Sequence, residues 1–348
     1  MRVLSIGSDR KLFEDGSFVC ERTKKYGEHM EELHIVVFAL KNLGFRKKKI
    51  GENITIYPTN SLTKFQYIGD AIKIARSIKY DRITTQDPFI SGWAGVSISA
   101  KSKKPLQVQI HTDFLLEGFQ KGGYINRFYV RMANHVLPKA DCIRVVSERI
   151  KENIEARYKL KSIPRVLPIF VDIEAIKNAP KNEKEFPFQI AMSSRLEPEK
   201  NIGRAIKVLS RIVNERIGMV IVGEGGERLR LEKVARDLGI ESGVLFKGWI
   251  QNPVPYIKSS DLFLQTSEFE GYGMSVVEAL ASGVPALSTD VGIAKEYGAD
   301  VFETDEELKE KIERYIENGG MGELKNYPYK NEEEYIKKYV EMIEICGS

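Results

Sequence analysis

The chain of 348 residues is 42% hydrophobic and 29% charged, which is typical of two globular domains that each bury a sizeable core and excludes a disordered protein. Three widely spaced cysteines without a CxxC pair indicate neither a disulfide framework nor a structural zinc site. The first residues carry no signal-peptide pattern and no stretch reaches the roughly 18 apolar residues of a membrane span, so we expect a protein of the reducing cytoplasm.

The net charge of +4 is unevenly distributed along the chain. Residues 1–172 hold 30 Lys and Arg against 18 Asp and Glu, whereas residues 173–348 hold 23 against 31. The basic clusters Arg46-Lys47-Lys48-Lys49 and Lys101, Lys103, Lys104 are either solvated loops or a surface that holds the first half near an anionic substrate or near anionic lipid at the inner face of the membrane. No recognition motif accompanies these clusters, so we expect no nucleic-acid partner.

Short β-branched runs alternate with helical stretches in both halves of the chain, a pattern typical of parallel βαβ units. In the first half the predicted strands are Val3–Gly7, His34–Ala39, Ile54–Tyr57, Arg82–Thr85, Leu106–Ile110, Cys142–Val146 and Val166–Phe170, with helices over Phe65–Lys79 and Ile125–His135. In the second half the predicted strands are Phe188–Met192, Met219–Val222, Val244–Lys247, Leu262–Thr266 and Pro285–Ser288, with helices over Ile202–Asn214, Glu227–Leu238 and Ser275–Ser282. We therefore predict two doubly wound, Rossmann-like α/β domains.

The predicted boundary is the polar, proline-bearing segment Asp172–Pro187. It separates an N-terminal domain, residues 1–172, from a C-terminal domain, residues 173–330. The last segment reads as an amphipathic helix within residues 331–348, and we expect it to join the N-terminal domain.

Ligands of parallel sheets bind beyond the carboxyl ends of the strands, so the residues that follow each predicted strand are candidates for a site. Gly223-Glu224-Gly225-Gly226 follows one strand and is either a backbone approach to a ligand or a mere tight turn. Arg195 and Lys200 flank the loop after another strand, where they either neutralise a diphosphate or pair with neighbouring glutamates.

The stretch EFEGYGMSVVEALASGVP carries two glutamates on either side of a Gly-Tyr-Gly turn. The turn precedes a predicted helix whose first amides can face an anion. Glu278 falls one turn into that helix among apolar neighbours, where it either accepts hydrogen bonds from a vicinal diol such as a ribose or is an exposed helix residue. Glu270, one loop earlier, would reach a group beyond the phosphates.

These residues resemble the retaining glycosyltransferases of the GT-B architecture, glycosyltransferase family four. The likeness is strongest from Ala191 to Glu296, where SSRLEPEKN, VGEGG, FKGWI, the E-x(7)-E stretch and KEYG follow in the family's order. The resemblance implies two Rossmann-like domains facing a central cleft. It also implies a nucleoside diphosphate sugar, UDP- or GDP-linked, as substrate, with no separate cofactor.

By the same resemblance, Glu278 would bind the ribose, Glu270 the sugar hydroxyls, and Arg195 and Lys200 the diphosphate. The remaining donor-binding residues would be Gly223, Gly225, Gly248, Trp249 and the segment Gly271, Tyr272, Gly273 and Met274. The position of Tyr272, inward or over the donor, stays open.

The first half resembles the family less closely. QVQIHTDF matches a strand that ends in a histidine, which makes His111 a candidate for contact with the transferred sugar or the acceptor. The family's Gly-Gly loop after the first strand is replaced by residues 9–17, of which only Gly16 matches, and Ser17 is a candidate cap of the next helix.

The absence of a DxD motif and of a His cluster predicts that no metal balances the diphosphate. We therefore expect a cytoplasmic hexosyltransferase of polysaccharide biosynthesis that acts on a glycan, lipid-linked or small-molecule acceptor with retention of configuration. The alternatives are a sugar-nucleotide epimerase of similar fold and a non-catalytic nucleotide-binding partner subunit.

Overall fold

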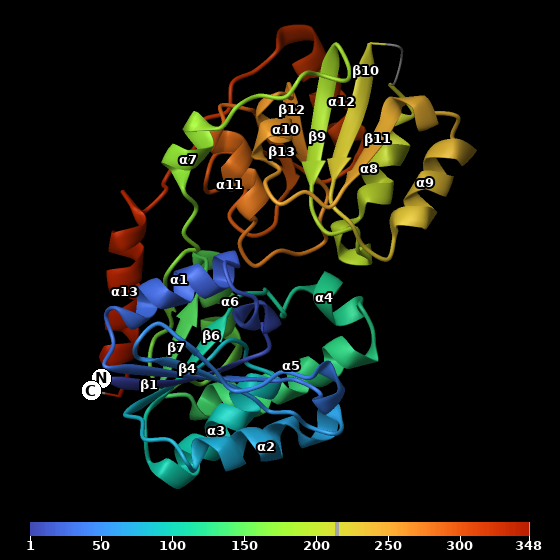
Figure 1. Cartoon of the computed structure of the whole chain (residues 1–348). Helices are drawn as coiled ribbons and strands as arrows, with labels where there is room; N and C mark the ends of the chain where they lie inside the picture. The colour runs from blue at the N-terminus through green and yellow to red at the C-terminus, as the bar shows by residue number, and fades with distance from the viewer. Residues whose placement is uncertain (213–215, 348) are drawn as a thin grey trace. The chain divides into compact units, whose positions relative to one another are not determined.

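The protein's structure, a computed structural model, describes residues 1–212 and 216–347 and divides into two compact units (Figure 1). The N-terminal unit comprises residues 1–168 together with the C-terminal residues from Tyr329 onward. The C-terminal unit comprises Ile169–Pro328. Each unit is built around one mostly parallel sheet, as the alternation of strands and helices predicts.

The sheet of the N-terminal unit has the strand order β3-β4-β2-β1-β5-β6-β7-β8. Every neighbouring pair is parallel except β3 and β4, which are antiparallel. The strands are β1 (Arg2–Gly7), β2 (Glu32–Val37), β3 (Lys48–Ile50), β4 (Ile54–Pro58), β5 (Arg82–Thr85), β6 (Leu106–Ile110), β7 (Cys142–Val145) and β8 (Arg165–Val166).

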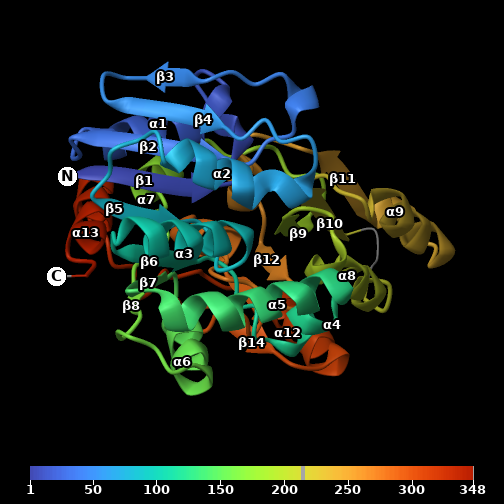
Figure 2. The same ribbon diagram turned by 90° about the horizontal axis from the view of Figure 1, so that it is seen from below.

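Helices cover both faces of this sheet (Figures 1 and 2). Helices α2 (Tyr67–Ala75), α3 (Ile90–Ser102) and α5 (Tyr124–Val136) pack together over one face, and α1 (Phe18–Gly27) packs with α13 (Glu332–Glu344) over the other. The shorter α4 (Glu117–Lys121) contacts α5, and α6 (Glu148–Arg157) contacts β7.

The sheet of the C-terminal unit is entirely parallel, with the order β11-β10-β9-β12-β13-β14. Its strands are β9 (Phe188–Ser193), β10 (Ile217–Val222), β11 (Val244–Gly248), β12 (Leu262–Gln265), β13 (Ala286–Thr289) and β14 (Asp300–Phe302). Its helices are α7 (Ile173–Asn178), α8 (Ile202–Leu209), α9 (Arg228–Asp237), α10 (Val254–Lys258), α11 (Met274–Ala281) and α12 (Asp305–Asn318). One apolar core joins the sheet to α8, α9 and α12 through residues such as Ile190, Ile206 and Leu264.

Most predicted strands are confirmed to within one or two residues, but three edges of the sheets were misjudged. β3 and β14 were not predicted at all, because β3 lies in a lysine-rich run and β14 is only three residues long. The strand predicted over Val166–Phe170 is wrong beyond Val166. Pro168 follows two residues later, and a proline has no amide to donate to a neighbouring strand.

The predicted helices were located correctly, but Phe65–Lys79 and Ile202–Asn214 were drawn too long, whereas the other bounds differ by about one residue. Helix α8 ends at Leu209, and the end predicted at Asn214 lies outside the described residues. The segment expected to be an irregular boundary contains α7, which is capped by Asp172 and packs on α11 within the C-terminal unit. Ser17 caps α1, as predicted, by accepting a hydrogen bond from Cys20 N at 3.2 Å.

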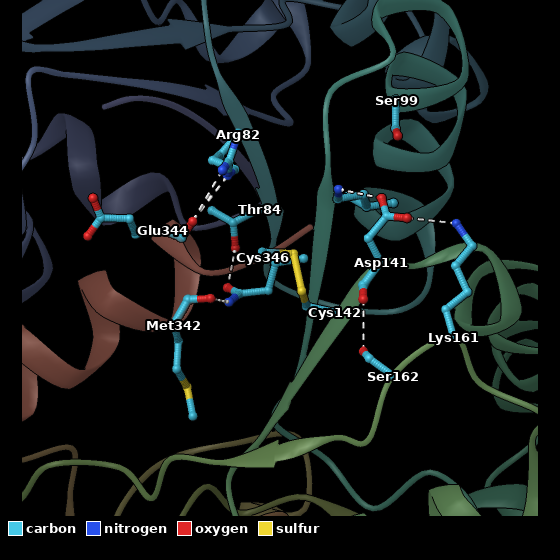
Figure 3. The surroundings of a disulfide bond; sticks show 12 residues. Arg82, Thr84, Ser99, Asp141, Cys142, Lys161, Ser162, Met342, Glu344 and Cys346 are labelled. Atoms are coloured by element: carbon cyan, nitrogen blue, oxygen red, sulfur yellow. Dashed lines mark hydrogen bonds and ion pairs between the residues drawn. A yellow bond between two sulfur atoms is a disulfide. The ribbon is translucent and has the colours of Figure 1, made fainter. Parts of the chain in front are cut away.

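The C-terminal helix α13 is held on the sheet of the N-terminal unit by aromatic packing and hydrogen bonds. Tyr339 stacks on Tyr26 of α1 with ring centroids 4.5 Å apart, and Gln107 of β6 donates to the carbonyl of Met342 at 2.9 Å. Arg82 donates to the carbonyl of Glu344 at 3.2 Å (Figure 3). The helix was predicted from its periodicity and expected to join the N-terminal domain, but periodicity does not identify the side chains that it contacts there.

A disulfide joins Cys142, the first residue of β7, to Cys346, just after α13 (Figure 3). The two residues are 204 positions apart in the sequence, with Cα atoms 5.6 Å apart. The expectation that the cysteines form no disulfide is therefore wrong for this pair, because a spacing rule sees only cysteines that are close in sequence. Cys20 is a buried free thiol.

Reduction of this disulfide is expected to destabilise the N-terminal unit by about 2–4 kcal/mol, because the bridge closes a long loop of the unfolded chain. Urea denaturation of the oxidised and the reduced wild type measures the difference. In Cys346→Ser the reductant should have no further effect. Identical curves for the oxidised and the reduced wild type would show that the bridge does not stabilise the fold.

Candidate active site

The loops that follow β9, β10, β11, β12 and β13 meet at one edge of the C-terminal sheet, because the strands are parallel. Backbone hydrogen bonds join these loops to one another. Ser194 N donates to Val222 O at 3.1 Å, and Leu196 N donates to Glu224 O at 2.9 Å. Gly223 N donates to Gly248 O at 2.8 Å. The loops therefore form one connected platform rather than separate flexible turns.

The glycines of the sequence GEGG permit this connection. Gly223 has φ +142°, and a Cβ atom there would lie 1.8 Å from Ser194 O. A Cβ atom on Gly225 would lie 2.3 Å from Leu196 O. The close approach that these glycines allow is thus to the backbone of the neighbouring loop. Contact of Gly223 and Gly225 with a donor remains a prediction.

Lys200 and Glu270, predicted to serve different parts of a ligand, form an ion pair with each other. Lys200 Nζ lies 2.5 Å from Glu270 Oε1, and the two side chains are only 12% and 16% exposed. Ser267 also donates to Glu270 Oε1, at 2.8 Å. A cation and an anion that are nearly buried together present both charges to a ligand at one point.

Arg195 behaves differently from Lys200. Its side chain is 72% exposed and pairs with Glu199 at 3.0 Å. Both cations belong to the loop after β9, which includes the short 3₁₀ turn Pro198–Lys200. Arg195 is therefore free to change partner at small cost, since an exposed pair contributes little to stability.

The Gly271-Tyr272-Gly273 turn is fixed by the loop after β13. Ile293 N donates to Tyr272 O at 2.9 Å, and Gly292 (φ +56°) approaches so closely that a Cβ atom would lie 2.2 Å from that carbonyl. Gly273 precedes α11 and has no side chain to cap its first amides, and Met274 begins the helix with a 42% exposed side chain. The start of α11 is thereby left to an external acceptor.

The side chain of Tyr272 points into the protein. It is 3% exposed, meets Tyr297 edge-on at 5.9 Å, and its hydroxyl lies 3.4 Å from that of Tyr297. Of the two positions that the sequence allowed, the ring therefore takes the inward one and anchors the turn. Only the backbone of Tyr272 is available to a sugar-nucleotide donor.

Glu278 lies one turn into α11, between the buried Val277 and Ala279. Among residues 1–212 and 216–347 its carboxylate has neither a hydrogen-bond partner nor an ion pair. Burial raises its pKa from 4.5 to about 7. A half-buried carboxylate without donors is a position that a pair of hydroxyl groups would satisfy.

Gly248 and Trp249, at the end of β11, occupy the same edge of the sheet. Gly248 has φ +77°, and the indole of Trp249 is 67% exposed. A large exposed aromatic side chain beside the site offers a surface on which a planar base can stack.

The two candidates in the N-terminal unit lie at the carboxyl edge of its own sheet. His111 follows β6, and its Nε2 lies 3.2 Å from Gln109 Oε1. Burial, together with the positive charges of Arg144 and Arg22, lowers the pKa of His111 to about 3. Gly16 has φ +74° in open surroundings and ends the turn that precedes Ser17.

Sequence reasoning missed three residues that hold the site together. Thr266 donates through its hydroxyl to the carbonyls of Lys200 and Asn201, both at 3.0 Å, while Ser267 and Gly292 support Glu270 and the glycine turn as described above. Thr266 and Gly292 act on loops distant in sequence, so no local motif reveals them, whereas Ser267 acts on Glu270 only three residues away.

In the described part of the chain, no group of three or more His, Cys, Asp or Glu side chains is placed to hold a metal ion. Within the same residues, no helix is both long and apolar enough to cross a membrane.

Two family models together match nearly the whole chain. The model described as Glycosyltransferase Family 4 matches residues 28–175, and the model described as Glycosyl transferases group 1 matches residues 173–335. The chain belongs to the group 1, family 4 glycosyltransferases. The first of these family 4 matches covers strands β2 to β8 of the N-terminal sheet, and the second covers all six strands of the C-terminal sheet.

The names of the relatives give different products or acceptors. Alpha-monoglucosyldiacylglycerol synthase of Streptococcus pneumoniae is 27% identical over 65% of this chain and 56% of its own length. Poly(glycerol-phosphate) alpha-glucosyltransferase of Bacillus subtilis is 33% identical over 40% of this chain, and the match covers 20% of that relative. Lipopolysaccharide 1,6-galactosyltransferase of Salmonella typhimurium is 31% identical over 43% of each. The chain thus spans about half or less of the length of these relatives.

Solved structures confirm the GT-B architecture of this family 4 glycosyltransferase. HepE of Anabaena, solved with UDP and glucose, aligns with a TM-score of 0.69 and 18% identity over 91% of this chain and 90% of its own. Sucrose-phosphate synthase of Thermosynechococcus elongatus aligns with a TM-score of 0.73 and 15% identity over 99% and 95%. At these identities the likeness shows the fold alone.

The raised pKa of Glu278 predicts a pH-dependent effect of Glu278→Gln on stability. Above pH 7 the folded protein carries an unsatisfied buried carboxylate, whereas below pH 4.5 the group is neutral in both the folded and the unfolded state. Glu278→Gln should therefore raise the free energy of unfolding by about 2–3 kcal/mol at pH 8 and by much less at pH 4.5. Urea denaturation at both pH values measures this. An equal effect at the two pH values would contradict the proposed environment of Glu278.

Proposed function

We propose that this protein transfers a sugar from a nucleoside diphosphate sugar to a glycan, lipid-linked or small-molecule acceptor, with retention of anomeric configuration and without a bound metal ion. The observation that carries the proposal is the nearly buried Lys200–Glu270 pair on the same platform as the unsatisfied Glu278. A cation, an anion and a hydrogen-bond acceptor there match the diphosphate, the sugar and the ribose of one donor.

The ion pair suggests how the donor is recognised. A diphosphate competes with Glu270 for the ammonium group of Lys200, and Arg195 moves from Glu199 to the second phosphate. Release from Lys200 leaves a Glu270 oxygen free to accept hydrogen bonds from sugar hydroxyls. The ribose hydroxyls donate to Glu278, while the amides at the start of α11 add a favourable dipole.

In the transfer step the bond between the anomeric carbon and the phosphate oxygen breaks, and a bond from the acceptor oxygen to the same carbon forms on the same face. The proton of the acceptor hydroxyl passes to the departing phosphate oxygen, so no protein nucleophile is needed. Lys200 and Arg195 stabilise the charge that develops on the leaving diphosphate.

The relatives favour transfer over the alternatives. Two of them are named for alpha-linked products, which an alpha-linked donor gives only with retention, and HepE was solved with UDP and glucose. None of these names supports the epimerase alternative. A non-catalytic partner subunit is disfavoured because Arg195, Lys200, Glu270 and Glu278 are all present.

A thermal-shift screen against UDP- and GDP-linked sugars tests the proposal, because a ligand that binds only the folded protein raises the melting temperature. One sugar nucleotide should raise the melting temperature. Lys200→Ala or Glu270→Gln should remove this rise and lower the rate of sugar transfer by at least about 100-fold. Glu268→Gln, an exposed residue of the same loop, is the matched control. Near-normal transfer by Glu270→Gln would refute the role given to that residue.

We further propose that the N-terminal unit contacts an anionic membrane at its inner, cytoplasmic face through α5. Tyr124, Ile125 and Phe128 of this helix are 88%, 67% and 53% exposed. Arg127 and Arg131 of the same helix are exposed, as is Lys121 at the end of α4, which pairs with Glu117 at 2.6 Å. Apolar side chains bordered by cations are typical of helices that lie in a lipid interface.

The lysine cluster at residues 47–49 is a poorer candidate than its sequence indicated. Lys48 belongs to β3, pairs with Asp15 at 2.7 Å and donates to Phe13 O at 2.9 Å, while Lys47 lies over the Tyr57 ring. These side chains already serve the edge of the sheet.

Ile125→Ser combined with Phe128→Ser should reduce co-sedimentation with phosphatidylglycerol vesicles by at least about tenfold, because both side chains would lose burial in lipid. The control is Ile163→Ser, which removes a side chain that is 74% exposed elsewhere in the same unit. Equal binding by the two variants would exclude α5 as the contact.

A further inference from the structure

A buried arginine without a carboxylate partner lies next to His111 in the N-terminal unit. Arg144 is 2% exposed, and among residues 1–212 and 216–347 it forms no ion pair. Its guanidinium donates to Gln109 Oε1 at 2.6 Å and to Leu167 O at 3.1 Å. Its Nε is buried without a hydrogen-bond partner. A charge buried at such cost requires an explanation beyond packing.

Aromatic side chains from the C-terminal helix compensate part of this charge. The guanidinium lies 5.3 Å from the centre of the Tyr339 ring and donates to the hydroxyl of Tyr335 at 3.3 Å. The negative faces of aromatic rings and phenol oxygens attract a cation without neutralising it. The positive charge of Arg144 is therefore retained beside β6.

This charge fixes the orientation of the Gln109 amide. Gln109 and Arg144 are paired across β6 and β7, and a guanidinium can only donate hydrogen bonds. The carbonyl oxygen of Gln109 must therefore face Arg144. The amide nitrogen accordingly donates to Thr84 Oγ1 at 2.9 Å and to the Tyr339 hydroxyl at 3.0 Å.

The same oxygen also determines the protonation of His111. Gln109 Oε1 only accepts hydrogen bonds, so His111 Nε2, at 3.2 Å, must carry a hydrogen. The charged groups that face the imidazole are Arg144 from β7 and Arg22 from α1, both positive, while the phenols of Tyr335 and Tyr339 on α13 contact Arg144 and Gln109. Two cations disfavour a second proton, so the imidazole is neutral and its Nδ1 carries a lone pair.

We propose that Gln109 and Arg144 are positioning residues that hold His111 as the neutral imidazole protonated at Nε2, so that His111 acts only as a hydrogen-bond acceptor for a substrate hydroxyl group. The second half of this inference rests on the proposed glycosyltransferase function, whereas the tautomer does not. The C-terminal helix takes part because Tyr339 holds the far side of the Gln109 amide.

Imidazole ¹H–¹⁵N correlation spectra of the full chain test the tautomer without any activity measurement. The protein has four histidines, and the spectrum of His111→Asn assigns the signal. In the wild type His111 should show the Nε2–H tautomer and no titration between pH 5.5 and pH 8.5. Titration of His111 with the ordinary pKa of a histidine, or a spectrum of the Nδ1–H tautomer, would overturn the proposal even if sugar transfer is observed.

Gln109→Glu replaces the neutral acceptor with a carboxylate and should bring the titration of His111 into the measured pH range. Transfer by this variant should then fall about tenfold for each pH unit below the new midpoint and recover above it, whereas wild-type transfer should not follow such a curve. A purely structural defect would lower activity equally at every pH.

Two further variants keep the test decisive if Gln109→Glu does not fold. Gln109→Met removes the acceptor without adding charge and should give a mixture of tautomers. Glu32→Gln alters the contact of Glu32 with His34, 3.1 Å away in the same unit, and should leave the His111 signal unchanged. If the His111 spectra are as expected but no sugar transfer is detected, the proposed function is refuted and the tautomer assignment stands.

Discussion

The candidate donor site depends on the backbone hydrogen bonds between loops at the carboxyl edge of the C-terminal sheet. Ser194, Leu196 and Gly223 donate to neighbouring loops, and the glycines at 223 and 225 leave room for a contact that any Cβ atom would block. This platform places Lys200 against Glu270, although seventy residues separate them in sequence. Because the polar contacts are made by the backbone, the side chains at the same edge remain available to a ligand.

The half-buried Glu278 and the buried Arg144, one in each unit, differ in the partners that the fold provides for their charges. Glu278 has no hydrogen-bond donor in the described structure, and burial raises its pKa to about 7. Its hydrogen bonds are therefore completed only when hydroxyl groups of a ligand bind. Arg144 has carbonyl, phenol and aromatic partners but no carboxylate, so its charge persists and acts on Gln109 and His111. The first arrangement favours binding of a ligand, and the second favours a fixed protonation state.

Several features were accessible from sequence because they are local. The strands β5 and β6 were predicted with their exact bounds, and the E-x(7)-E stretch placed Glu270 in a loop and Glu278 one turn into α11. Other features depend on partners far away in the chain. The disulfide joins residues 204 positions apart, β3 and β14 exist only as edges of larger sheets, and Tyr272 packs inward because Tyr297 is there to receive it. Local patterns carry no information about such partners.

The sequence by itself determined the alternation of strands and helices, the family and the residue types that carry charge at the ends of strands, since these follow from periodicity and short motifs. Only the tertiary structure decided which of those charges meet. It paired Lys200 with Glu270, left Glu278 without a hydrogen-bond donor and placed Arg144 against the tyrosines of a helix from the other end of the chain. The reason is physical: the free energy of a buried charge depends on the groups within a few ångströms of it, and the fold, not the order of residues, brings those groups together.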